Sequence, residues 1–132
     1  MKSSLHDYMK VGLIHFMAYP FAASGDGDIV RTIEEIAIDD FFDAIEITRI
    51  NDVEQRKIAK AIIDTAGMTV GFGAQPYILK GKLNLNSTDE QERAKAVEVL
   101  KEAVDQAYEM GARKLGFLSG PKPETEIGRA HV

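Results

Sequence analysis

The sequence of 132 residues contains no cysteine, which excludes disulfide bonds and thiol catalysis and fits a reducing compartment. It has no basic excess either, since 16 Lys and Arg face 21 Asp and Glu, and no basic stripe is available for a phosphate backbone. No apolar run approaches the roughly 20 residues that span a bilayer, and residues 1–10 lack a signal-peptide stretch. We therefore expect a cytoplasmic protein without a nucleic-acid or membrane partner.

The chain does contain a repeated pattern of apolar segments and amphipathic segments. Its 45% hydrophobic and 28% charged residues are typical of a single globular domain. Short apolar segments, interpreted as strands, occupy residues 11–17, 43–48, 68–74 and 114–118. Because helical patterns separate them, and parallel neighbours need crossover helices, the sequence predicts an α/β fold with four parallel strands and three intervening helices.

The three helices are predicted from apolar spacing and from capping residues. The first covers residues 28–38, and the second follows Asp52, with Gly67 as its C-cap. The third follows a capping box that begins at Ser87, and Gly111 ends it. We expect the third helix to bury one stripe of side chains, namely Ala94, Val97, Leu100, Val104, Ala107 and Tyr108.

The loops predict where a binding site lies. The strand-to-helix loops at 18–27 and 75–86 are long, whereas the helix-to-strand connections at 39–42 and 67–68 are short. Long loops at the carboxyl ends of parallel strands usually carry the chemistry of such folds. Polar side chains at those strand ends are therefore candidates for ligand binding.

Four residues are candidates for substrate binding: His15, Glu46, Gln75 and Ser119. Glu46 lies within an otherwise apolar strand, where a carboxylate is costly unless it is paired or faces a wet cleft. A structural partner for Glu46, a core position for His15 and a simple turn at Ser119 are the alternatives. The side chains of Asn84 and Asn86 could add amide contacts.

Several familiar motifs are incomplete or absent in this sequence. The segment from Gly25 to Val30 resembles a dinucleotide fingerprint but lacks its third glycine, and Asp26 and Asp28 lack the remaining ligands of an EF-hand. No paired-histidine metal motif and no nucleophile elbow occurs.

Three longer segments carry a family resemblance. Residues 83–93, 106–112 and 115–120, together with the strand Phe42-Asp-Ala-Ile-Glu-Ile47, resemble the sugar phosphate isomerase/epimerase family, which has the xylose-isomerase-like TIM barrel. The resemblance runs from Val11 to Pro121. It implies that residues 11–126 form the N-terminal half of a (β/α)8 barrel of about 250 residues.

The resemblance also implies a chemistry. Family members hold a divalent metal (Mn, Mg, Co or Zn) on ligands largely from the second half of the barrel, and move a proton beside a sugar carbonyl. No glutamate of this chain matches their catalytic positions, so the catalytic residues are unknown. The chain alone is expected to bind no metal and to be inactive, with a sugar or sugar phosphate as its ligand.

The two ends of the sequence are interpreted separately. Residues 1–10 are expected to be an N-terminal extension, and residues 127–132 a non-native tail, because a widely used sequencing adapter encodes the same six residues before a stop codon. A half barrel would have open edge strands and an exposed apolar inner face. A non-catalytic sugar-binding or assembly module, in which a homodimer closes the barrel, is therefore an alternative, and a flavodoxin-like domain is another.

Overall fold

The fold is a four-stranded parallel sheet, seen in a computed structural model that describes residues 4–122. The predicted tail at 127–132, and the end of the predicted half barrel at 126, lie outside the described residues. The strands follow each other across the sheet in chain order as β1 (Gly12–Ile14), β2 (Ala44–Ile47), β3 (Thr69–Gly73) and β4 (Lys114–Gly116). All pairs are parallel, which confirms the predicted α/β class.

Three long helices connect the strands, close to their predicted bounds. They are α2 (Ile29–Ala37), α3 (Val53–Ala66) and α5 (Glu90–Glu109). The expected caps of α3 are present, since the Asp52 side chain accepts from the Gln55 N–H and Gly67 adopts a left-handed conformation. No helix within residues 4–122 is long and apolar enough to cross a membrane.

Four short helical segments were not predicted; they lie in the N-terminal extension, at the end of the predicted first strand and in the two long loops. They are η1 (Ser4–Asp7), α1 (His15–Ala18), η2 (Pro20–Ser24) and α4 (Gln75–Lys80). The first strand is therefore shorter than predicted, because β1 ends at Ile14 and the chain turns into α1. This early turn decides where His15 points.

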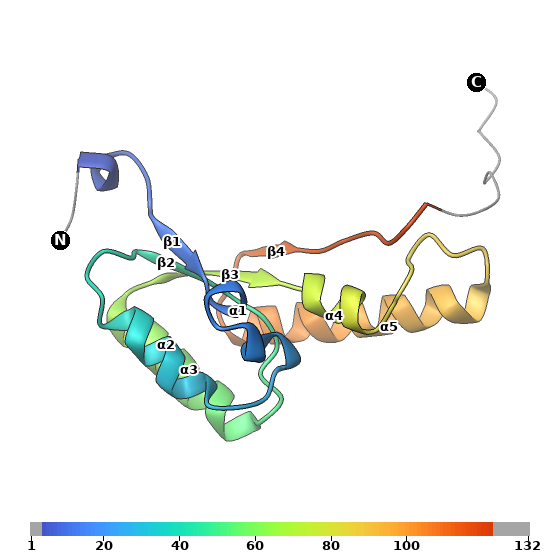
Figure 1. Ribbon diagram of the computed structural model, residues 1–132, viewed down its shortest axis with the longest axis horizontal. Helices are drawn as coiled ribbons and strands as arrows, with labels where there is room; N and C mark the ends of the chain where they lie inside the picture. The colour runs from blue at the N-terminus through green and yellow to red at the C-terminus, as the bar shows by residue number, and fades with distance from the viewer. Residues whose placement is uncertain (1–3, 123–132) are drawn as a thin grey trace.

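The helices cover a single face of the sheet. Figure 1 shows α2, α3 and α5 on the same side of the four strands. A flavodoxin-like domain has helices on both faces and places its second strand outside the first, so the observed strand order contradicts that alternative. Sequential strands with helices on one side are compatible with half of a (β/α)8 barrel, without distinguishing it from other one-sided α/β arrangements.

The hydrophobic core lies between the sheet and these helices. Ile45 and Ile47 of β2 and Phe72 of β3 are each 1% exposed and belong to the same cluster as helix residues Ile33 and Ile63. Alternate strand residues therefore point toward the helices, as the period of two requires.

The other face of the sheet corrects an expectation. It was expected to be apolar, but its positions are occupied mainly by glycine and polar residues: Gly12, Ile14, Ala44, Glu46, Thr69, Gly71, Gly73, Lys114 and Gly116. Because glycine has no side chain, the larger side chains of this face have room to lie across the strands.

The predicted buried stripe of α5 is correct only in part. Ala96, Ala103 and Ala107 are buried, whereas Val97, Val104 and Tyr108 are exposed by 37%, 52% and 86%. Small alanine side chains let the helix approach the sheet closely, and the larger apolar residues remain outside. Leu100 and Ala107 are the members of the predicted stripe that pack against the core.

Candidate functional site

Glu46 and Gln75 meet at the carboxyl ends of β2 and β3. Glu46 is the third residue of β2, and Gln75 begins α4 directly after β3. A Cβ atom added to Gly73 would lie 2.6 Å from Gln75 Oε1 and 2.8 Å from Glu46 Oε1, so both oxygens converge over this glycine. A Cβ on Gly116 would similarly lie 3.0 Å from Gln75 Nε2. The two glycines thus create the space that the polar side chains occupy.

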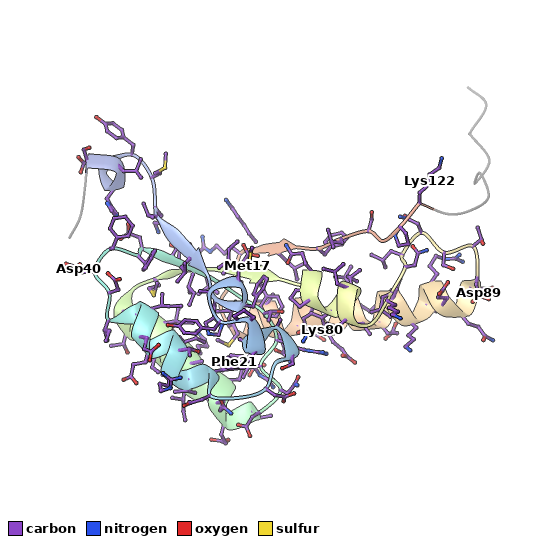
Figure 2. All side chains as sticks on the ribbon, in the orientation of Figure 1. Met17, Phe21, Asp40, Lys80, Asp89 and Lys122 are labelled. Atoms are coloured by element: carbon purple, nitrogen blue, oxygen red, sulfur yellow. The ribbon has the colours of Figure 1, made fainter. Side chains whose placement is uncertain are left out.

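A cavity of about 400 Å³ opens beside this pair. Glu46 and Gln75 are its polar residues together with Lys80, and its remaining walls are apolar: Ile14, Phe16, Met17, Ala23, Pro76 and Leu79. Figure 2 labels two of the lining residues, Met17 of α1 and Lys80 at the end of α4. A few convergent polar groups against an apolar wall are typical of a small-molecule site.

Both members of the pair offer free hydrogen-bond acceptors. Within residues 4–122, the Glu46 side chain makes no hydrogen bond or ion pair, and Gln75 Oε1 is buried without a partner. The structural partner that was the alternative explanation of Glu46 is therefore not seen among these residues. Two neighbouring acceptors attract donors such as hydroxyl groups and repel anions.

Other buried polar atoms without a hydrogen-bond partner gather at the same end of the sheet. Besides Gln75 Oε1, those in the described chain are Thr48 Oγ1, Arg49 Nε, Gln55 Oε1, Arg56 Nε and Tyr77 Oη. Arg56 Nε forms an ion pair with Glu109, whose carboxylate oxygen lies 2.9 Å away, although the hydrogen-bond geometry is poor. All of them follow β2 or β3 in the chain. Because buried polar groups are normally satisfied, their concentration here distinguishes this end of the sheet from the rest of the described fold.

His15 does not join Glu46 and Gln75. It is 2% exposed, and its Nε2 lies 2.8 Å from Thr32 Oγ1 on α2. Thr32 donates its single proton to the Ile29 carbonyl at 3.0 Å, so His15 Nε2 is the donor to Thr32. Burial lowers the pKa of His15 to about 4, which keeps the ring neutral. His15 therefore occupies a core position, which was the alternative to a role in substrate binding.

Ser119 is also separate from the pair. It lies beyond β4, its carbonyl accepts from the Leu85 N–H at 3.1 Å, and it lines a different cavity of about 430 Å³. The amides of Asn84 and Asn86 are used within the loop: Asn84 Oδ1 accepts from the Asn86 N–H at 2.9 Å, and Asn86 Nδ2 donates to the Pro121 carbonyl at 3.3 Å. These bonds hold the segment after β4 in place.

Sequence reasoning missed two residues at this end of the sheet, Arg49 and Tyr77. The Arg49 guanidinium carbon lies 4.7 Å from the centroid of the Tyr77 ring. Tyr77 is 4% exposed, and burial raises the pKa of its hydroxyl. The signal in the sequence was Arg49 itself, a cationic residue two positions beyond the end of a buried strand. Residues at the carboxyl ends of parallel strands lie at the usual binding face of such folds.

The described residues do not fit the divalent metal that the family resemblance implies. Between residues 4 and 122, no three His, Cys, Asp or Glu side chains lie close enough to hold a metal ion. Glu46 is the only carboxylate among the residues that line the cavity. We therefore derive no chemical step through a metal.

A scan of the sequence against models of known protein families finds no match, and a search of curated proteins also finds none.

Proposed function

We propose that this chain corresponds to the first four strands of a metal-dependent sugar or sugar phosphate isomerase/epimerase barrel. In that role it supplies one side of the sugar-binding site. The observation that carries the proposal is the convergence of Glu46 and Gln75 over Gly73. Hydrogen-bond acceptors that face an apolar wall suit a sugar. Its C–H groups pack on Phe16, and its hydroxyl groups donate hydrogen bonds to Glu46 and Gln75.

The chemistry of such an enzyme is proton transfer beside a sugar carbonyl, which needs a positioned base and a stabilised oxyanion. Glu46 and Gln75 would orient the sugar hydroxyls, and the described residues contain no second carboxylate at the cavity to exchange the proton. We therefore expect the purified chain to show no ketose isomerisation with Mn²⁺ or Co²⁺. Turnover by the purified chain would contradict this assignment of roles.

Sugar binding can be tested without catalysis. Titration of the ¹⁵N-labelled chain with a neutral ketose such as fructose should shift the amides of Gly71, Gly73 and Gln75. Gly73→Ala should abolish these shifts, because its Cβ would lie 2.8 Å or less from Glu46 Oε1 and Gln75 Oε1 and must displace them.

Gly71→Ala is the matched control. Its Cβ would meet Glu46 atoms only at 3.7 and 3.8 Å, an ordinary contact, so binding should persist. Neither glycine has a positive φ, so alanine introduces no backbone strain at either position. Equal effects of the two substitutions, or no binding by the unmodified chain, would contradict the proposal.

A second candidate function is a non-catalytic module in which two copies close a barrel. The observation that favours it is the pair of outer strands, β1 and β4, each of which has a neighbour on one side only in the described sheet. Large apolar side chains lie at or just beyond these edges, since Ile14 is 36% exposed and Phe117 and Leu118 are 48% and 40% exposed. Sedimentation separates the two candidates, because a discrete dimer favours the module and a polydisperse sample favours the enzyme half.

A further inference from the structure

Arg49 is held rigidly at the carboxyl end of β2. Its guanidinium lies over the Tyr77 ring at 4.7 Å, and its stem packs against Gly25, where an added Cβ would lie 2.8 Å from Arg49 Cγ. Gly25 needs to be glycine for a second reason, its φ of +83°. An arginine fixed by stacking and by close backbone contact has already lost most of its side-chain freedom.

The hydrogen-bonding capacity of this arginine is unused. Arg49 Nε is buried without an acceptor, and within residues 4–122 the guanidinium makes no hydrogen bond or ion pair. Arg56, on the next helix, is by contrast satisfied, because it donates to the Ile50 carbonyl at 2.6 Å and lies 2.9 Å from the Glu109 carboxylate. A fixed guanidinium without an acceptor is unusual in a chain with 21 acidic residues.

The surrounding groups do not satisfy Arg49 either. The carboxylate of Asp26, in the loop that packs on Arg49, accepts from Asn51 Nδ2 at 2.9 Å. Glu102 of α5 acts electrostatically on Tyr77, beneath the guanidinium, but forms no ion pair with Arg49. Other buried polar atoms of the described chain at this end of the sheet also lack a hydrogen-bond partner, so none of them bonds to Arg49: Thr48 Oγ1, Gln55 Oε1, Gln75 Oε1 and Tyr77 Oη.

We propose that Arg49 binds an anionic group, a phosphate or a carboxylate, as a subsite at the carboxyl end of the sheet. The planar guanidinium presents parallel N–H donors that match two oxygens of either group. Arg49 does not line the cavity beside Glu46 and Gln75, and the Glu46 carboxylate repels an anion. A ligand that bound at both positions would therefore place its hydroxyl-bearing part at the cavity and its anionic part at Arg49. The proposal depends on the proposed function only for the hydroxyl-bearing part.

The test follows the arginine Nε–H resonances of the full chain during titration with inorganic phosphate. The Arg49 resonance and the Tyr77 amide should shift in a saturable way. Arg49→Gln should weaken phosphate binding by at least about tenfold, as loss of a charged hydrogen-bond donor does. Arg49→Lys should be intermediate, because it keeps the charge and loses the bidentate geometry.

Arg113→Gln is the control, since Arg113 is an exposed arginine that directly precedes β4, at the opposite end of the sheet, and it should bind phosphate as the unmodified chain does. No saturable shift at Arg49, or equal weakening by Arg49→Gln and Arg113→Gln, overturns the proposal. If Arg49→Gln does not fold, as judged by its amide spectrum, the Arg49 shift in the unmodified chain and the Arg49→Lys variant decide.

Parallel titrations with fructose, fructose 6-phosphate and gluconate separate this proposal from the proposed function. If fructose shifts Gly73 and none of the anions shifts Arg49, the subsite is wrong and the sugar site stands. If phosphate and both anionic ligands shift Arg49 while no sugar affects Gly73, the subsite stands and the sugar site is wrong. A larger effect of the phosphate ester than of gluconate identifies phosphate as the preferred anion.

Discussion

The buried histidine makes the stability of this fold depend on pH. His15 is neutral in the core and donates to Thr32, and burial lowers its pKa from 6.5 to about 4. Between these two pH values the unfolded chain binds more protons at this site than the folded chain does. The free energy of unfolding therefore falls as the pH falls through this window.

The expected loss from His15 is up to about 3 kcal/mol between neutral pH and pH 4. Urea denaturation at a series of pH values measures it, with His15→Gln as the comparison, because glutamine keeps an N–H donor and does not titrate. The unmodified chain should lose more stability on acidification than His15→Gln. Parallel pH profiles for the two proteins would show that His15 does not carry this dependence.

Glu46, Gln75 and His15 also show how far single residues could be predicted. A carboxylate in an apolar strand and an amide directly after the next strand were visible in the sequence, and both lie on the uncovered face. The space over Gly73 and Gly116 that these side chains occupy was not visible, because it depends on the register between strands. His15 was assigned to a strand that ends one residue earlier, and the turn into α1 directs its ring to the core.

The three long helices were predictable in number and extent, whereas the short helical segments and the capping details depend on local geometry. Ser87 was expected to cap α5, yet the cap is Asp89, whose carboxylate accepts from the Glu92 N–H at 2.8 Å. Ser87 Oγ instead accepts from the Asp89 N–H at 3.1 Å and donates to the Glu92 carboxylate. Serine and aspartate are equally good N-cap residues, so residue type alone does not select Asp89 over Ser87, and the path of the preceding loop decides.

Removal of this cap should destabilise the element measurably. Asp89→Ala is expected to cost about 1 kcal/mol of unfolding free energy, and Asp89→Asn considerably less, since asparagine also caps well. Asp105→Ala is the control, because Asp105 is exposed within α5 and alanine is the better helix former. Urea denaturation at neutral pH measures all three. A cost for Asp105→Ala as large as that for Asp89→Ala would show that the cap is not responsible.

At the scale of the whole molecule, the predicted alternation of strands and helices is confirmed. The prediction that the uncovered face of the sheet is apolar is wrong. The strands lie in chain order with helices on one side, as the crossover rule requires. The sequence segments looked apolar as a whole, but the apolar residues point mainly to the helices and the glycines and charges to the other face. Composition alone does not separate the two faces of a short strand, because the register that assigns them comes from the neighbouring strands.

The uncovered face of the sheet becomes the interior of the barrel if two copies of the chain assemble into one. In a barrel closed by two copies, Ile14 at the end of the outer strand β1 becomes buried beside Glu46, its neighbour on β2, and a glutamate there would place a second carboxylate next to Glu46. Ile14→Glu should then convert a dimer to monomer in sedimentation. Val104→Glu should leave the dimer intact, because Val104 lies on the outward side of α5, where it is 52% exposed. Dissociation by both variants would place the contact on the helices, and dissociation by Val104→Glu alone would exclude barrel closure as the mode of assembly.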